Sequence, residues 1–169
     1  MKSIRKIAIL GISGSGKSTL SRQLEELLDL PVIHMDQIFW RGNWEEVPSA
    51  EYLAMHEEKV EESSWIIEGY IDVIMSNRTK LADLIIYLDY SGLRCALRVL
   101  KRWLVHRNQS RPELPKEALE RFSTNFLWMV LHRGERQGIE DALQKVNPEK
   151  IKRFRSPREL TNFLQNMSL

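Results

Sequence analysis

Residues 11–18 read GISGSGKS and match the phosphate-binding loop pattern G-x-x-x-x-G-K-[ST]. Glycines in such a loop let the backbone turn its N–H groups inward, where they bind phosphate oxygens together with the N-terminus of the following helix. Lys17 is expected to reach the β- and γ-phosphates of ATP, and the Ser18 hydroxyl is expected to bind Mg²⁺. The residues expected to hold the nucleotide in and beside this loop are Gly11, Ser13, Gly14, Ser15, Gly16, Lys17, Ser18 and Thr19.

Two carboxylic acids stand at the ends of short apolar runs that have the composition of buried strands. Asp36 follows the second such run and Glu68 ends the third. Ligands of open α/β sheets bind at the carboxyl ends of the strands, so both acids are expected near the phosphate-binding loop. Asp36 could hold Mg²⁺ through water or accept a proton from a substrate hydroxyl, and Glu68 could orient the metal, although Asp is the usual residue there. We predict Ser18, Asp36 and Glu68 as metal-binding residues, with Asp89 as a weaker competitor.

Arginines form a second cluster of candidate residues. Arg94, Arg98 and Arg102 recur every four residues and therefore share one face of a helix predicted over 91–106. Their mutual repulsion would be relieved by an anionic ligand or by solvent. Arg107 and Arg111 flank a polar loop, and arginines on a mobile loop can close over phosphates. The residues expected to act in phosphoryl transfer are Lys17, Asp36, Arg98, Arg102, Arg107 and Arg111.

Other side chains are candidates for binding the two substrates. Phe39, Trp40 and Trp44 follow Asp36 closely and could line an acceptor pocket, although aromatic residues pack in cores as often. Arg155 follows the last apolar run, at an end of the predicted sheet that could border the nucleotide base. We therefore expect Arg155 to contact the nucleotide.

Alternating apolar and amphipathic runs predict the elements that position these residues. Strands are expected over 4–10, 31–34, 65–68, 84–88 and 150–154. Helices are expected over 17–28, 49–62, 91–106 and 116–132, with a further helix starting at 156. Strands that alternate with helices indicate a parallel sheet covered on both faces. A length of 169 residues suits one α/β domain, so residues 1–169 are predicted to form a single domain.

Composition excludes several classes of protein. Hydrophobic residues make up 43% of the chain, which excludes extensive disorder, and a net charge of +2 does not by itself indicate nucleic-acid binding. The single cysteine, Cys95, excludes an internal disulfide, and the four histidines lack the spacing of zinc ligands. The N-terminus has no signal-like apolar region, and no apolar run approaches membrane-spanning length, so a cytoplasmic protein with no membrane partner is expected.

Taken in order along the chain, these segments resemble a known family. They comprise the phosphate-binding loop, HMDQIFW at 34–40, WIIEGY at 65–70, ADLIIYLD at 82–89, RVLKR at 98–102, Arg111-Pro112, and FRSPRE at 154–159. Together they resemble the bacterial proteins described as DNA topology modulation proteins (FlaR-related). That family is similar to adenylate, cytidylate and shikimate kinases. The resemblance covers nearly the whole chain.

The resemblance implies a nucleoside-monophosphate-kinase-like three-layer sandwich, with a five-stranded parallel sheet of order 2-3-1-4-5. It also implies a small helical lid at about 105–115 and an acceptor-binding region at about 36–62. The spacing of Arg98 and Arg102 resembles the arginine pair before the lid of adenylate kinases, and Arg111 resembles the lid arginine of shikimate kinases. The chain departs from the family pattern at Glu68, where relatives commonly have Asp, and at Tyr70, which directly follows Gly69.

Three functional hypotheses follow. The first is a kinase that moves the γ-phosphoryl group of ATP·Mg²⁺ to a small acceptor such as a nucleoside monophosphate. The second is a nucleotide-dependent DNA-binding regulator of DNA topology, supported by basic stretches at 90–112 and 150–158 but not by any DNA-reading motif. The third is a protein that binds ATP without turning it over. The sequence specifies neither the acceptor nor the oligomeric state.

Overall fold

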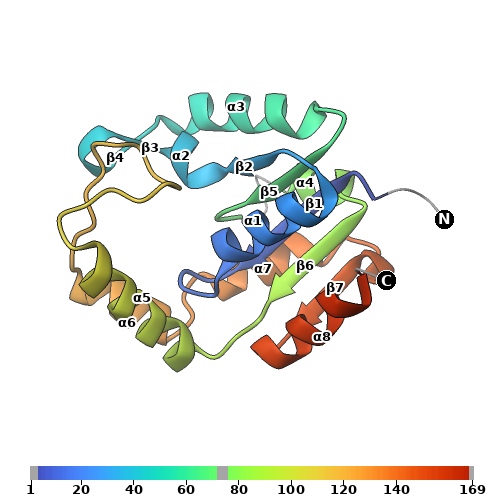
Figure 1. The fold of residues 1–169 in the computed structure, drawn as a ribbon. Coiled ribbons are helices and arrows are strands. Elements are labelled where there is room, and N and C mark those ends of the chain that lie inside the picture. The colour runs from blue at the N-terminus through green and yellow to red at the C-terminus, as the bar shows by residue number, and fades with distance from the viewer. Residues whose placement is uncertain (1–3, 72–75, 168–169) are drawn as a thin grey trace.

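The central feature of the computed structural model, which describes residues 4–71 and 76–167, is a five-stranded parallel sheet (Figure 1). The strands lie in the order β2-β5-β1-β6-β7. Counted along the chain within this sheet alone, that order is the expected 2-3-1-4-5, and the α/β fold class is confirmed. The strands of this sheet are β1 (Lys6–Gly11), β2 (Val32–His34), β5 (Trp65–Glu68), β6 (Leu84–Leu88) and β7 (Ile151–Phe154).

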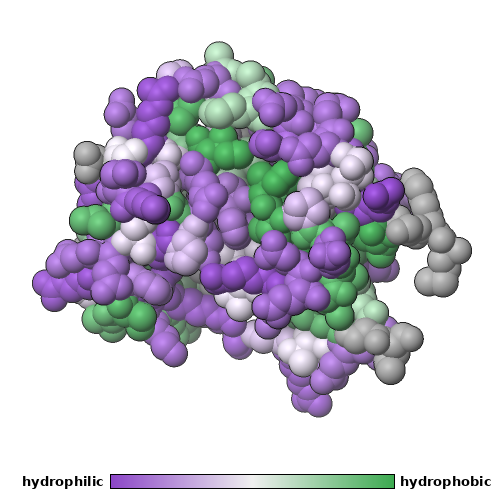
Figure 2. All heavy atoms as spheres, turned by 45° about the horizontal axis from the view of Figure 1, so that its top comes forward, coloured by the Kyte–Doolittle hydropathy of each residue, from purple (hydrophilic) through white to green (hydrophobic). Residues whose placement is uncertain are grey.

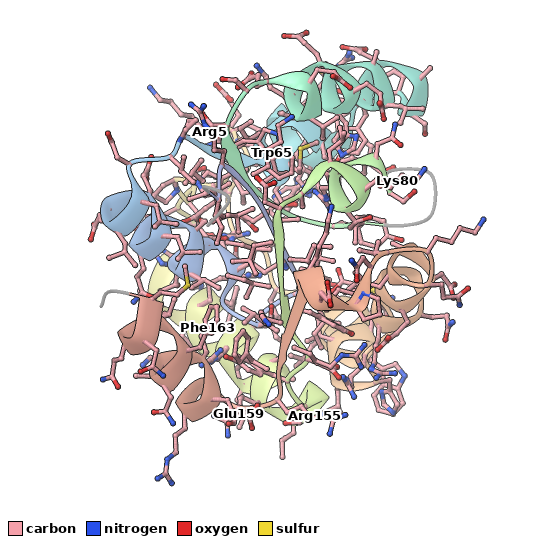
Figure 3. The ribbon with its side chains drawn as sticks, turned by 90° about the vertical axis from the view of Figure 1, so that its right-hand side faces the viewer. Arg5, Trp65, Lys80, Arg155, Glu159 and Phe163 are labelled. Carbon is pink, nitrogen blue, oxygen red and sulfur yellow. The ribbon has the colours of Figure 1, made fainter. Side chains whose placement is uncertain are left out.

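Helices cover both faces of the sheet. Figure 3 shows α1 and α8 on one side of it and α4 and α7 on the other, which gives three layers. The helices are α1 (Lys17–Leu28), α2 (Met35–Phe39), α3 (Ser49–Glu61), α4 (Asn77–Leu81), α5 (Gly92–His106), α6 (Thr124–Leu131), α7 (Arg136–Leu143) and α8 (Pro157–Met167). The minor elements are a two-stranded sheet of β3 (Trp40–Arg41) and β4 (Glu45–Glu46), and the 3₁₀ turns η1 (Gly42–Trp44) and η2 (Pro148–Lys150).

The core consists of apolar strands packed between amphipathic helices. Every residue of β5 and β6 is buried, as expected for central parallel strands whose two faces are both covered. Leu20 and Leu24 pack onto this core from α1, and Ile139 and Leu143 pack onto it from α7. Hydrophilic side chains cover most of the face seen in Figure 2, where hydrophobic residues gather only in separate groups. Within the described residues, no helix is both long and apolar enough to cross a membrane.

The prediction of a helix over 116–132 was wrong in its first half. Helix α6 begins only at Thr124, where the Ser123 side chain caps it by accepting a hydrogen bond from the backbone N–H of Phe126 at 3.2 Å. Upstream, the backbone N–H of Glu120 donates to the carbonyl oxygen of Gln109 at 2.9 Å. That bond holds residue 120 against residue 109 and so prevents a continuous helix.

The segment of residues 107–123 links α5 to α6 and is irregular. It consists of turns and one isolated bridge between Arg107 and Glu120, so the lid expected to be helical at about 105–115 is helical only at residues 105 and 106, where α5 ends. Figure 1 shows this segment, in gold, beside the β3–β4 pair. Trp44 Nε1 donates to the carbonyl oxygen of Leu119 at 2.6 Å, and Gln37 Nε2 donates to that of Pro112. The segment is therefore anchored to the part of the chain that follows β2.

Candidate active site

The phosphate-binding loop connects β1 to α1 and is shaped by glycine. Gly14 has a φ of +78°, and a Cβ atom there would lie 2.5 Å from the carbonyl oxygen of Cys95 in α5. Only glycine fits this position because the conformation is left-handed and the neighbouring backbone is close. Gly16, at the N-cap of α1, has a φ of +100°, and no described side chain caps this helix. The first N–H groups of α1 therefore remain available to an anion.

Two basic side chains surround the loop. The Lys17 Nζ atom donates to the carbonyl oxygen of Gly11 at 3.0 Å, so its charge lies over the loop. An Arg98 Nη atom donates to the carbonyl oxygen of Ser15 at 2.8 Å and thereby ties α5 to the loop. These contacts place Arg98 of α5 and Lys17 beside the loop.

A hydrogen-bonded chain joins Ser18, Glu68 and His34. The Ser18 hydroxyl donates to Glu68 Oε1 at 2.9 Å, and His34 Nδ1 lies 2.7 Å from the same oxygen. Burial alone would raise the pKa of the Glu68 carboxyl, but the hydrogen bond from His34 and the charge of Lys17 lower it below its ordinary value. Burial alone would likewise lower the pKa of His34, but its contact with Glu68 raises it. Glu68 is therefore held ionised beside the loop.

Asp36 lies in the first turn of α2, directly after β2, and is half-buried. Burial, and then the nearby charge of Glu68, raise the pKa of the Asp36 carboxyl above its ordinary value, while Lys17 and Arg111 oppose the shift. Among the described residues, no group of three or more His, Cys, Asp or Glu side chains forms a metal-binding cluster. Mg²⁺ needs no such cluster, because it keeps several of its waters and is bound through one or two carboxylates together with substrate phosphates.

Two cavities meet beside these side chains. The phosphate cavity, of about 670 Å³, is lined by residues 13–19 of the loop region. The aromatic cavity, of about 470 Å³, is lined by aromatic side chains from α2, β3, η1, α3, α5, α6 and the 107–123 segment, together with aliphatic and charged residues. Four residues line both cavities, and these are Ser13, Asp36, Arg102 and Arg111. The two cavities therefore adjoin each other at these residues.

Arg102 and Arg111 are held by one carboxylate. Arg102 Nε donates to Glu120 Oε1 at 3.0 Å, and Arg111 Nε donates to Glu120 Oε2 at 2.8 Å. Glu120 is buried. Burial and the charge of Arg111 lower the pKa of the Arg102 guanidinium, although Glu120 opposes that shift. This pairing positions both arginines at the junction of the cavities.

Glu135 is a site residue that the sequence analysis missed. Its Oε1 accepts a hydrogen bond from the Ser13 hydroxyl at 2.9 Å, and its Oε2 accepts one from the Ser13 backbone N–H. Glu135 precedes α7 and is separated from Ser13 by 122 residues of sequence. An acid at a helix start is typical of exposed surfaces, so no local signal distinguishes this one.

Arg107, Arg155 and Asp89 are predicted residues that lie apart from the cavities. Arg107 is exposed, with its guanidinium carbon 5.7 Å from the ring centre of Trp103, and Arg155 is exposed beside Glu159 at the start of α8 (Figure 3). Neither is among the described residues that line the two cavities. Asp89 instead forms ion pairs with arginines, including Arg136 at 3.2 Å. The prediction of nucleotide contact by Arg155 therefore gains no support from this geometry.

Comparison with known proteins identifies the fold. No protein-family model and no curated protein sequence matches this chain. A shikimate kinase from Acinetobacter baumannii in complex with shikimate aligns with a TM-score of 0.60 and 16% identity, over 98% of this chain and 93% of that one. A deoxyadenosine kinase from M. mycoides with bound dATP aligns with a TM-score of 0.57 and 16% identity, over 96% of this chain and 98% of that one. A sugar kinase from a Janibacter species aligns with a TM-score of 0.57 and 15% identity, over 98% of this chain and 94% of that one.

These three structures are P-loop kinases, and at such low identity the likeness shows a shared fold. The specific resemblance to DNA topology modulation proteins has no support from the comparisons. Function must therefore be argued from the geometry of the site.

Proposed function

We propose that this chain is a phosphotransferase that moves the γ-phosphoryl group of ATP to a small acceptor bound in the aromatic cavity. The observation that carries the proposal is the junction of the two cavities at Ser13, Asp36, Arg102 and Arg111. A triphosphate on the loop would direct its terminal phosphate towards this junction. An acceptor in the aromatic cavity would present its hydroxyl at the same place, which is the arrangement that in-line transfer needs.

In this proposal the loop region binds the phosphates and the metal ion. The loop N–H groups and Lys17 bind the β- and γ-phosphates, and Lys17 exchanges its present contact with the Gly11 carbonyl for a phosphate oxygen. The Ser18 hydroxyl would hold Mg²⁺, and Glu68, which already accepts a hydrogen bond from Ser18, would orient the waters of the metal. When bound, Mg²⁺ would neutralise charge on the β- and γ-phosphates.

Asp36 and the paired arginines act at the transferred group. Asp36 could also reach the waters of the metal, but its place at the junction favours the acceptor hydroxyl, which it orients and whose proton it accepts. Arg102 and Arg111 stabilise charge on the transferred phosphoryl group. Arg98 supports the loop through the Ser15 carbonyl. We assign no part in the transfer to Arg107 or Arg155.

The whole chain is proposed to act as one kinase domain. Its acceptor-binding region is residues 36–62, which contribute Asp36, Phe39, Trp40, Trp44 and Tyr52 to the aromatic cavity. Its lid is the 107–123 segment, which contributes Arg111 and Glu120 and contacts the acceptor-binding region through Trp44. Closure of such a segment excludes water, so transfer to the acceptor is favoured over hydrolysis.

The DNA-binding alternative receives less support. In the basic stretch 90–112, Arg102 and Arg111 face inward and pair with Glu120. In the stretch 150–158, Arg153 pairs with Glu140 at 2.7 Å and with Asp89 at 3.5 Å. These three arginines are therefore already paired within the chain, which lowers the charge that the two stretches offer to a phosphate backbone.

The test combines nucleotide binding with acceptor phosphorylation. Calorimetry should detect binding of a non-hydrolysable ATP analogue with Mg²⁺. Phosphorus NMR should then reveal a new phosphate ester when ATP and a panel of nucleosides, nucleoside monophosphates, sugars and other small alcohols are added. Absence of nucleotide binding would refute the proposal. Binding with hydrolysis alone across the whole panel would refute phosphoryl transfer and favour a protein that binds ATP without kinase turnover.

A further inference from the structure

The aromatic cavity is walled on two sides by rings. On the side of the acceptor-binding region, the ring centres of Phe39 and Trp40 lie 4.6 Å apart and those of Trp40 and Trp44 lie 5.3 Å apart. On the side of α5 and the 107–123 segment, the ring centres of Trp103 and Phe122 lie 4.9 Å apart. All five rings line the cavity. Such walls suit a flat ring, which gains dispersion and stacking contacts that a small acyclic alcohol cannot make.

The charges that line this cavity are balanced. Its described lining residues include three arginines, Arg102, Arg111 and Arg121, and three carboxylates, Asp36, Glu120 and Glu135. The two arginines nearest the phosphate cavity already share the buried Glu120. The two other carboxylates lie at the same end, since Asp36 lines both cavities and Glu135 binds Ser13.

This balance disfavours an anionic acceptor. A phosphate monoester carries about 1.5 to 2 negative charges at neutral pH and is usually bound by arginines that can offer it both N–H donors. Here Glu120 already offsets the charge of two arginines, so such an acceptor would add its own charge beside a buried carboxylate and would also approach Asp36 and Glu135. A ring-bearing alcohol without charge meets neither obstacle.

We infer that the acceptor is an uncharged alcohol with a flat heterocyclic ring, of the nucleoside type, and not a nucleoside monophosphate. The inference rests on the proposed function. The ring lies between the Trp40–Trp44 side and the Trp103–Phe122 side, and the hydroxyl lies at Asp36. The hydroxyl oxygen forms a bond to the γ-phosphorus while the bond from that phosphorus to the β–γ bridging oxygen breaks. ADP leaves with the electron pair of that bond, and the hydroxyl proton passes to the Asp36 carboxylate.

Matched pairs of ligands test the inference directly. Each of the common nucleosides is compared with its own 5′-monophosphate, so that only the phosphate differs within a pair. Binding is measured without turnover from quenching of tryptophan fluorescence, because Trp40, Trp44 and Trp103 line the cavity. At least one nucleoside should bind about tenfold more tightly than its monophosphate. With ATP and Mg²⁺, the product should be the nucleoside monophosphate.

A pair of tryptophan variants locates the binding. Trp103→Ala should weaken nucleoside binding about tenfold, as expected for loss of one stacking partner, and should leave binding of the ATP analogue unchanged. Trp128→Ala is the matched control, because Trp128 is 65% exposed on α6 and is not among the described lining residues. Unchanged binding of the ATP analogue to both variants shows that each is folded.

The outcomes separate the inference from the proposed function. Tighter binding and phosphorylation of a monophosphate, with its nucleoside inert, would overturn the inference and leave the proposed function intact. Absence of quenching by either member of every pair would also overturn it. Selective nucleoside binding that depends on Trp103, without phosphoryl transfer, would support the ligand class and refute the proposed function.

Discussion

The carboxylate of Glu135 holds Ser13 at two points, the side-chain hydroxyl at 2.9 Å and the backbone N–H. The carboxylate thereby occupies one N–H group of the loop. It also brings its negative charge close to the other loop N–H groups, which are suited to binding phosphate. A nucleotide whose γ-phosphate reaches Ser13 must displace this carboxylate or tolerate its charge. Glu135 is therefore expected to weaken ATP binding more than ADP binding.

Glu135→Gln should consequently tighten binding of ATP·Mg²⁺ about fivefold, which corresponds to removal of one solvent-screened charge at close range. The affinity for ADP should change less, because ADP lacks the terminal phosphate. Calorimetric titration with the ATP analogue and with ADP measures both. Asp141→Asn removes one charge from α7, the helix that follows Glu135, and serves as the control; Gln137 Nε2 donates to Asp141 at 2.8 Å. Equal or weaker ATP binding by Glu135→Gln would contradict this account.

Glu68→Gln tests the metal-orienting role of Glu68. The neutral amide can still accept a hydrogen bond from Ser18, but it binds the waters of a metal less strongly than a carboxylate does. We expect about 10- to 100-fold more Mg²⁺ to be needed for half-maximal turnover, with little change in metal-free nucleotide binding. A magnesium titration of the initial rate measures this. Glu61→Gln, at an exposed glutamate that ends α3, is the control. An unchanged magnesium requirement would remove Glu68 from the metal site.

Asp36→Asn should lower kcat by about 10²- to 10⁴-fold, the usual contribution of a positioned proton acceptor. The KM for ATP should hardly change, because the loop and Lys17 remain intact. Steady-state kinetics against both substrates separate these two effects. Asp29→Asn is a suitable comparison, since Asp29 is exposed at the C-cap of α1 and Asn tolerates its left-handed backbone. A variant at position 36 with normal kcat would rule out proton acceptance by Asp36.

Asp89 supplies a prediction about stability and pH. Burial alone would raise the pKa of the Asp89 carboxyl, but the hydrogen bond from Arg136 and the charges of Arg133, Arg136 and Arg153 hold it below its ordinary value of 3.8. A carboxyl with a lowered folded-state pKa stabilises the fold above its unfolded pKa, and the stabilisation is lost as the pH falls through the folded pKa. The contribution of Asp89 should therefore be complete near neutral pH and decline below about pH 4.

Asp89→Asn should accordingly destabilise the fold by about 1–3 kcal/mol at pH 7, or about 2–4 °C in Tm for each kcal/mol. The difference in free energy of unfolding between wild type and variant should become smaller below about pH 4. Thermal unfolding followed by circular dichroism at several pH values measures this difference in stability. Glu58→Gln, which removes an acid whose side chain is 75% exposed on α3, should change little at any pH. If the stability difference between wild type and Asp89→Asn stays constant down to pH 2, ionisation of Asp89 does not stabilise the fold.

Much of the fold was predictable because its signals are local. The strands β5 and β6 are continuous apolar runs, and their bounds were predicted correctly. Helix α1 was also bounded correctly, since the loop glycines precede it and its apolar residues have helical spacing. The α6 prediction failed because Glu120 is fixed by partners on other parts of the chain, which helical periodicity does not reveal.

The site was predictable where residues act within a motif and unpredictable where they meet across the fold. Lys17 and Ser18 follow from the loop pattern. Glu135 reaches Ser13 only because α7, which it precedes, packs against β1 of the sheet. Trp103 and Phe122 had the appearance of ordinary helix residues, since periodicity does not tell which apolar face is turned to a cavity. Arg155 was placed by strand order alone, which fixes the end of the sheet but not the direction of a side chain.

In the proposed reaction, a triphosphate bound by the loop passes its terminal phosphate across the junction to an acceptor in the aromatic cavity. The most direct test is a single-turnover experiment with γ-labelled ATP, Mg²⁺, excess enzyme and the acceptor panel. Label should appear on an acceptor with the wild-type protein and be lost with Lys17→Ala, whereas Lys101→Ala, a change on the exposed face of α5, should transfer label normally. Label found only in inorganic phosphate, or transfer undiminished in Lys17→Ala, would contradict it.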